Sequence, residues 1–167
     1  MNIYFSCSLT GGRADQPIYA ALVEALLAQG HSVPTAALAH PGIMAEEAAI
    51  EPGVVYARDV AWVRGADALI AEVSTPSHGV GYEIALALAL GKPVLCLHRQ
   101  GARVSKMITG NSEPGISVRA YADQAGALRA AADYLAALGG AEYPGPQGRA
   151  EGSRWAGPRG GAAGARQ

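Results

Sequence analysis

The sequence predicts an α/β fold in which helices cover both faces of a parallel sheet. Short apolar runs rich in strand-forming residues alternate along the chain with segments whose apolar residues recur at helical spacing. Half of the 167 residues are apolar and 16% are charged, which is typical of one globular domain with a full core. Ligands of such sheets bind beyond the carboxyl ends of the strands, so the loops there are the expected site.

The order of elements follows from these patterns. Strands are expected at residues 3–8, 31–34, 68–73, 94–98 and 116–121. Helices are expected at residues 16–29, 53–65, 80–90 and 122–138, with Gly30 and Gly91 ending two of them. Residues 36–52 are ambiguous, part loop and part short helix. From residue 139 the chain is rich in Gly, Pro, Ala and Arg without periodicity, so we expect a catalytic domain at 1–138 and a disordered tail at 139–167.

Composition excludes several classes of function. The net charge of −1 provides no broad basic field, so no nucleic-acid partner is expected. No apolar run reaches the roughly 18 residues of a membrane span, and the N-terminus reads as a strand and not a signal peptide, which favours the cytoplasm. Cys7 and Cys96 lie in strand-like runs, where buried free thiols are expected. There is no CxxC and no histidine cluster with metal-ligand spacing, and neither a metal nor an organic cofactor is expected.

Glu83 is a carboxylate on an apolar helical stripe. Leu86 and Leu90 follow it at helical spacing, and the glycine-rich stretch 76–82 precedes it. A carboxylate in such a position is costly unless it is paired, protonated or used. The dipole at the helix start favours the ionised form, which suits a nucleophile. The alternative is a glutamate that complements the dipole and points to water.

Asp59 is a second carboxylate of this kind, in the middle of a predicted helix with a valine one turn away on either side. In a cleft it would suit a general acid. The alternative is a salt bridge to Arg58, Arg64 or Lys92. Tyr4, on the first strand, has a hydroxyl that could orient a carboxylate at the strand end, although a core aromatic is an equal alternative.

Loops after the strands provide candidate phosphate contacts. The first is Ser8-Leu9-Thr10-Gly11-Gly12-Arg13, whose amides and arginine suit an anion, although a tight turn with a solvated arginine is the alternative. The second contains Ser77 and Gly79, where ordinary N-capping by Ser77 is the alternative. A third, with Ser105 and Met107, could touch phosphate in the same chain or across a dimer interface, or be an exposed polar loop.

Several segments together resemble a known family. They are residues 4–13, 59–67, 71–83, 91–97 and 103–108, in order within 3–138. The block 71–83, Ala-Glu-Val-Ser-Thr-Pro-Ser-His-Gly-Val-Gly-Tyr-Glu, is the most specific. These segments resemble the 2′-deoxynucleoside 5′-monophosphate N-glycosidases (N-hydrolases) of the nucleoside 2-deoxyribosyltransferase superfamily.

The resemblance implies a homodimer whose subunits have a Rossmann-like (flavodoxin-like) sheet of five parallel strands. It implies that Glu83 is the nucleophile, Asp59 the acid/base and Tyr4 the tyrosine that orients the site. Substrate contacts are implied for Ser8, Gly11, Gly12 and Arg13 in the first loop, and for Ser77 and Gly79 at the phosphate. Ser105 and Met107 match positions that reach into the neighbouring subunit's site.

The chain departs from the family pattern at three places. Cys7 stands where the family often has Gly, Thr10 stands where it often has Arg, and residues 33–37 lack a histidine found in the animal members.

The sequence therefore predicts hydrolysis of the N-glycosidic bond of 2′-deoxynucleoside 5′-monophosphates by a retaining two-carboxylate mechanism. The products would be a free base and 2-deoxyribose 5-phosphate. A base-exchanging deoxyribosyltransferase is the main alternative, since a second base could capture the same intermediate. A phosphoribohydrolase fits the 76–83 motif poorly, and a non-catalytic nucleotide-binding module would need neither carboxylate. Four arginines in the tail are weak support for RNA contact.

Overall fold

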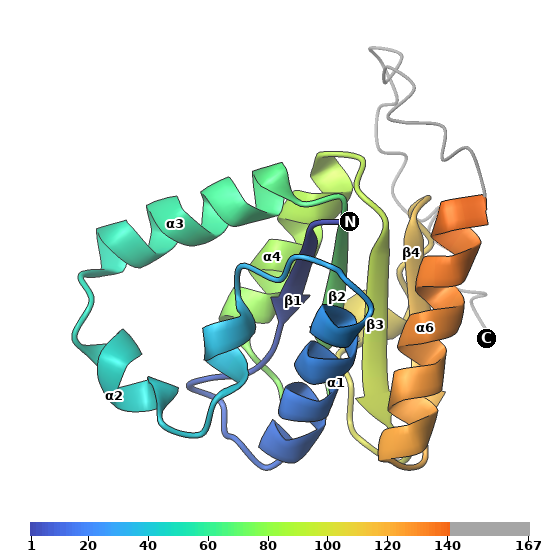
Figure 1. The fold of residues 1–167 in the computed structure, drawn as a ribbon, viewed down its shortest axis with the longest axis horizontal. Helices are drawn as coiled ribbons and strands as arrows, with labels where there is room; N and C mark the ends of the chain where they lie inside the picture. Colours follow the sequence, from blue (N-terminus) through green and yellow to red (C-terminus); the bar gives the residue numbers. More distant parts are fainter. Residues whose placement is uncertain (141–167) are drawn as a thin grey trace, which may run out of the picture.

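One parallel sheet organises the protein (Figure 1). The computed structural model describes residues 1–140, so the tail predicted at 139–167 lies outside the described residues from 141 onward. The four strands are β1 (Ile3–Ser6), β2 (Ala68–Glu72), β3 (Val94–Arg99) and β4 (Ile116–Tyr121). They are paired in the order β1-β2-β3-β4, with all three pairings parallel. All carboxyl ends therefore meet at one edge of the sheet, and the α/β fold class is confirmed.

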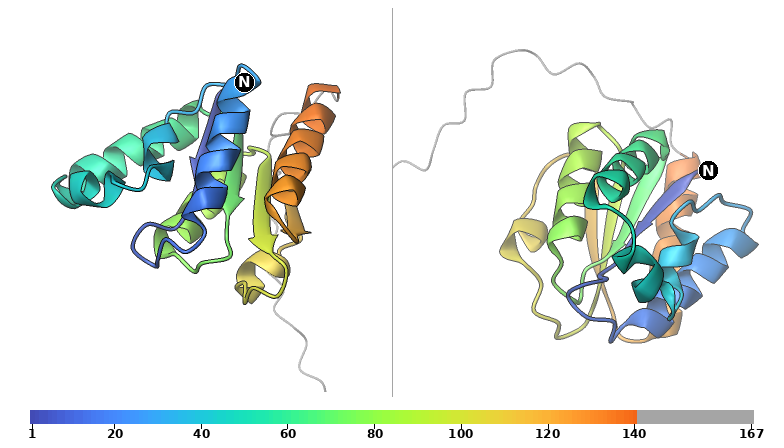
Figure 2. Two further views of the ribbon diagram at one scale, coloured as in Figure 1. Left: turned by 60° about the horizontal axis from the view of Figure 1, so that its bottom comes forward. Right: turned by 90° about the vertical axis from the view of Figure 1, so that its left-hand side faces the viewer.

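Helices cover both faces of the sheet, as predicted (Figure 2). On one face α1 (Gln16–Ala28) and α6 (Gln124–Gly140) pack on alternate strand residues such as Ile3 and Phe5. On the other face α3 (Pro52–Gly65) and α4 (His78–Ala89) enclose a core around Tyr4. Because side chains alternate across a strand, neighbouring residues of one strand belong to different cores.

The prediction of a fifth strand at 31–34 is wrong, since the sheet formed by the described residues has four strands. Only an isolated parallel bridge joins Ser32 to Asn2. Pro34 has no N–H to donate to a ladder. The amide of Phe5 donates to the side-chain oxygen of Thr35 at 3.1 Å, in place of a backbone carbonyl. The segment therefore leaves the edge of β1 after one pairing, and the sheet has four strands.

The remaining elements agree with the sequence to within about two residues at most ends, which is the usual uncertainty of helix boundaries. The ambiguous segment contains a 3₁₀ turn η1 (Ala36–Ala39) and a short helix α2 (Ile43–Ala48). A further short helix, α5 (Lys106–Thr109), precedes β4. Both free cysteines are buried, as predicted. Among residues 1–140, no helix has the length and apolar character that crossing a membrane requires.

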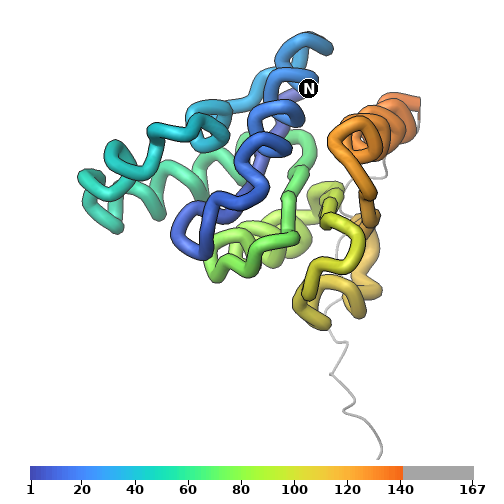
Figure 3. The backbone as a smooth tube through the Cα atoms, turned by 90° about the horizontal axis from the view of Figure 1, so that it is seen from below, coloured from blue at the N-terminus to red at the C-terminus, as the bar shows by residue number. Residues whose placement is uncertain are grey.

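Loops at the carboxyl edge pack directly on one another. Figure 3 looks onto this edge, where the loop after β1 (blue) lies beside the loop after β2 (green). A Cβ atom on Gly11 would overlap the carbonyl oxygen of Pro76, so only glycine allows this approach. Gly12 has φ of +127°, a conformation that side chains disfavour. These glycines join the first and second predicted loops into one surface.

Candidate active site

Glu83 is held by two hydroxyls of β1. Its Oε1 accepts a hydrogen bond from Tyr4 Oη at 2.8 Å, and its Oε2 accepts one from Ser6 Oγ at 2.5 Å. Tyr4 and Ser6 are two residues apart, so both side chains point to the face of the sheet that α4 covers. Sequence reasoning missed Ser6, although the alternation from Tyr4 would have revealed it.

The surroundings of Glu83 both raise and lower its pKa. Burial raises the pKa of this carboxyl, the hydrogen bonds from Ser6 and Tyr4 lower it, and the nearby charge of Asp59 raises it. Burial also raises the pKa of Tyr4, as do the charges of Glu83 and Asp59. Tyr4 therefore stays a phenol that donates, and Glu83 is a desolvated carboxyl with two fixed donors.

Asp59 faces the same cavity as Glu83. This cavity, of about 160 Å³, lies between α3 and α4. Its lining comprises Tyr56, Asp59, Val60, Val63, Gly79, Tyr82, Glu83 and Leu86. The hydroxyls of the exposed Tyr56 and Tyr82 lie 3.3 Å apart. A small ligand in this cavity would contact two carboxyl groups from different helices.

Asp59 is also paired, which was the alternative weighed from its sequence. Arg58 Nε donates to Asp59 Oδ1 at 2.8 Å. The same guanidinium donates to both carboxylate oxygens of Glu47 in α2, at 2.8 and 3.1 Å, and its Cζ lies 4.8 Å from the centre of the Trp62 ring. The pairing and the place beside a cavity therefore coexist. Glu47 was not predicted, because nothing in the sequence pattern links α2 to Asp59.

The first loop contributes contacts of two kinds. Ser8 is fully buried, and its Oγ has no hydrogen-bond partner among the described residues. Arg13 turns inward: Nη1 donates to the Leu38 carbonyl at 2.9 Å and Nη2 to that of His40 at 2.8 Å. Its half-buried guanidinium thereby ties η1 and His40 to the loop.

A larger cavity of about 1020 Å³ lies on the other side of α4. It is lined by five of the predicted contacts, namely Thr10, Gly11, Ser77, Ser105 and Met107, and by the basic side chains His78, Arg103 and Lys106. Residues 80, 81, 84 and 85 of α4 face this cavity, whereas residues 79, 82, 83 and 86 face the smaller one. At 100° per residue these sets occupy opposite sides of the helix.

The structure therefore brings Tyr4, Asp59, Glu83 and Gly79 together and does not bring Ser105 or Met107 to them within one chain. Met107 is 83% exposed. Ser77 caps α4, which was the alternative to a phosphate contact weighed from the sequence: its Oγ accepts a hydrogen bond from the amide of Val80 at 3.5 Å.

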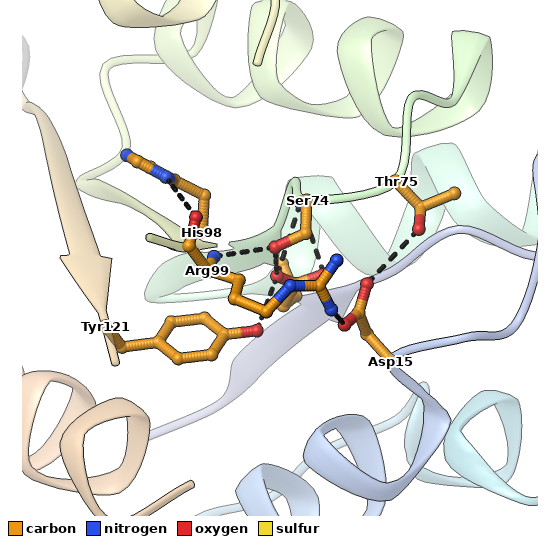
Figure 4. Close-up of polar contacts among 7 residues, drawn as sticks. Asp15, Ser74, Thr75, His98, Arg99 and Tyr121 are labelled. Carbon is orange, nitrogen blue, oxygen red and sulfur yellow. Dashed lines mark hydrogen bonds and ion pairs between the residues drawn. The ribbon is translucent and has the colours of Figure 1, made fainter. Parts of the chain in front are cut away.

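A fully buried carboxylate, Glu72, ends β2 on the opposite face of the sheet. It accepts hydrogen bonds from Tyr121 Oη at 2.9 Å, from the Ser74 amide at 3.2 Å, and from the Ser74 hydroxyl. Ser74 Oγ in turn accepts from the Arg99 amide at 2.7 Å. Figure 4 shows the surrounding contacts, in which Arg99 pairs with Asp15. Sequence reasoning missed this cluster, since residue 72 lies inside an apolar run.

The chain is similar to several known proteins. A family model described as nucleoside 2-deoxyribosyltransferase matches residues 3–140. The chain is 39% identical over 137 residues to a Methanosarcina mazei protein named "Putative 2'-deoxynucleoside 5'-phosphate N-hydrolase 1", across 82% of this chain and 85% of that one. It is 46% identical over 118 residues to the 5-hydroxymethyl-dUMP N-hydrolase of Mus musculus, across 67% of this chain and 66% of that one.

Among solved structures, the Clostridium botulinum CMP N-glycosidase BcmB has a similar fold. The TM-score is 0.62 at 20% identity, covering 80% of this chain and all of that one. At this identity the likeness concerns the fold alone.

Proposed function

Since the chain belongs to the nucleoside 2-deoxyribosyltransferase family, we propose that it hydrolyses the N-glycosidic bond of 2′-deoxynucleoside 5′-monophosphates. The products are a free base and 2-deoxyribose 5-phosphate. One observation carries the proposal: Glu83, held by Tyr4 and Ser6, faces the same cavity as Asp59. The names of the archaeal and mouse relatives support the reaction type.

Two carboxyl groups with different surroundings suit the two roles of a retaining glycosidase. Glu83 attacks C1′ while Asp59 gives a proton to the departing base, and a glycosyl ester forms on Glu83. Asp59 then takes a proton from water as that water attacks C1′, which frees Glu83 and the sugar phosphate. The transition state resembles an oxocarbenium ion, which forms more easily without an electron-withdrawing 2′-hydroxyl.

The hydroxyls of β1 serve this chemistry. Tyr4 and Ser6 donate to both oxygens of Glu83, so they favour its ionised form before attack. They also fix the direction of the carboxylate, which must approach C1′ in line with the departing base.

We place the 5′-phosphate near the start of α4, where Ser77 caps the helix, Gly79 lines the same cavity as Glu83 and the helix dipole favours an anion. Ser105 and Met107 are separated from Glu83 of their own chain by α4. We therefore propose that they act in the site of a second subunit of a homodimer. The exposed Met107 is suited to such a contact.

The test is incubation with a panel of deoxyribo- and ribonucleoside monophosphates, with base release followed by chromatography. Base should appear from deoxyribonucleoside monophosphates, more slowly from ribonucleotides and from nucleosides without phosphate. Glu83→Gln serves as the matched inactive control. Tight nucleotide binding without any base release would instead indicate a non-catalytic nucleotide-binding module.

The family description itself favours one other reaction, the transfer of deoxyribose between bases. Both reactions share the ester on Glu83 and differ in what captures it. Adding a second base to the assay separates them. Formation of a new nucleotide, at the expense of 2-deoxyribose 5-phosphate, would replace hydrolysis by transfer.

A further inference from the structure

A three-residue charge cluster adjoins the cavity: Glu47 from α2, and Arg58 and Asp59 from α3. Arg58 makes two hydrogen bonds to Glu47, at 2.8 and 3.1 Å, and one to Asp59 at 2.8 Å. The side chains of Glu47, Arg58 and Asp59 are 13%, 22% and 18% exposed, so water screens the cluster incompletely. The ring of Trp62 lies under the guanidinium and fixes its plane.

Arg58 alone would oppose the role proposed for Asp59. A cation in contact with a carboxyl group favours the charged form, whereas a general acid must carry a proton when the base departs. Arg58, however, donates three hydrogen bonds to carboxylates, and two of them are accepted by Glu47. The hydrogen bonds to Glu47 are also the largest cause of the raised pKa of Arg58, ahead of those to Asp59.

We propose that Glu47 is a positioning residue for proton transfer by Asp59: it anchors Arg58 and offsets its charge, so that Asp59 keeps both its orientation and its proton. This inference rests on the proposed function, in which Asp59 is the acid/base. Glu47 is not among the residues that line the cavity, and it accepts its two hydrogen bonds from Arg58. It therefore acts on Asp59 through the guanidinium of Arg58. The device also explains why α2 is tied to α3 beside the site.

The other charged and titratable groups around Asp59 act in the same cavity. Glu83 faces Asp59 from α4, and the charge of Asp59 raises the pKa of Glu83. Tyr4 approaches from β1, and Tyr56 and Tyr82 stand at the cavity between α3 and α4. None of these side chains carries a positive charge. Arg58 is therefore the cation bonded to Asp59 in the part of the chain that the structure describes, and Glu47 is its counter-charge.

Opposite substitutions test this balance. Glu47→Gln leaves Asp59 beside an uncompensated cation, so the alkaline limb of the pH profile of kcat/KM should move to lower pH, by roughly half to one unit. Arg58→Gln leaves Asp59 beside Glu47 without the cation, so the same limb should move to higher pH by a similar amount. The double variant should lie between them. The acid limb, which reports Glu83, should move less than the alkaline limb in all three.

Glu46→Gln is the matched control, because it removes the same charge from an exposed neighbour of Glu47. A purely structural role for Glu47 would lower kcat/KM at every pH without moving either limb. A second readout does not need turnover: the carboxyl carbon of Asp59 is followed by ¹³C NMR against pH in each variant, with Asp59→Asn for assignment.

Shifts of opposite sign in the two single variants support the inference. Shifts of the same sign, or none, in an enzyme that releases base overturn it. Opposite NMR shifts in a protein that releases no base from any nucleotide would keep the charge coupling and overturn the proposed reaction. The two failures are therefore distinguishable.

Discussion

Glu83 and Glu72 are two glutamates near the same edge of the sheet, on opposite faces, of which Glu72 is fully buried and Glu83 is half-buried. Burial is the main cause of a raised pKa in both. Glu83 borders a cavity, and its two partners are hydroxyls of one strand. Glu72 borders neither of the two cavities, and its partners include a backbone amide. Desolvation of a carboxylate therefore does not by itself indicate a catalytic group, and access to a cavity is the feature that separates Glu83 from Glu72.

The partners of Glu72 show what the second cluster does instead. Tyr121 ends β4, the Arg99 amide ends β3, and Ser74 begins the loop that leads to α4. Thr75 Oγ1 donates to Asp15 Oδ2 at 3.3 Å, which ties the same loop to the start of α1. Glu72 thus joins the ends of the strands to the loop that precedes Ser77.

The largest expected effect separates these two glutamates by activity. Glu83→Gln removes the proposed nucleophile and should lower the turnover of deoxyribonucleoside monophosphates by about 10⁴-fold or more, in a protein that remains folded. Glu72→Gln should retain measurable turnover. Both variants are compared by base release and by circular dichroism. A fully active Glu83→Gln enzyme would overturn the assignment of the nucleophile.

Substitution of Asp59 should have the next largest effect. Asp59→Asn removes the proposed proton donor and should lower kcat/KM by roughly 10²- to 10⁴-fold. The loss should shrink for substrates whose base departs easily without protonation. A loss that is equal for good and poor leaving groups would argue that Asp59 only shapes the cavity. The comparison of leaving groups is made at one pH.

For the free energy of unfolding, we expect the opposite order: Glu72→Gln should have a larger effect than Glu83→Gln. Glu72→Gln replaces one carboxylate oxygen by an NH₂ group that cannot accept from the Ser74 amide or the hydroxyls, so it should cost about 1–3 kcal/mol. Urea unfolding measures this cost, and Tyr121→Phe, which removes one donor, should cost less. If Glu83→Gln proved as destabilising as Glu72→Gln, the two glutamates could not be divided into one with a catalytic role and one with a stabilising role.

The pH dependence of stability should follow from the raised pKa of Glu72. Because its folded pKa lies above its unfolded value, the native state binds the extra proton. The stabilisation is present below the unfolded pKa and is lost as pH rises through the folded pKa. Urea midpoints across this range should decline with pH in the native chain and decline less in Glu72→Gln.

The smallest effect concerns the donors to Glu83. Tyr4→Phe and Ser6→Ala each remove a hydrogen bond that lowers the pKa of Glu83, so the ionised nucleophile should be lost at higher pH. The acid limb of kcat/KM should rise by up to about one unit in each variant. The alkaline limb should not move. An unchanged acid limb would mean that it does not report Glu83.

Much of this site was predictable from local patterns. Glu83 and Asp59 stood out because carboxylates interrupt apolar helical stripes, and Tyr4 because its strand ends at the expected edge. Their joint contact was not predictable from spacing, since Tyr4 and Glu83 are 79 residues apart. Arg13 shows the limit clearly: its place in a glycine-rich loop predicted an anion contact, but no spacing revealed that its guanidinium donates to the carbonyls of Leu38 and His40.

The sequence by itself determined the α/β class, the order of the elements and the glycine turns, because periods of two and 3.6 residues and backbone preferences are local properties. Only the tertiary structure decided that the segment at 31–34 leaves the sheet after one bridge. It also decided that α4 divides the predicted contacts between two cavities, and that Glu47 reaches Asp59 through Arg58. These features depend on which distant side chains meet, and that is set by how the layers pack.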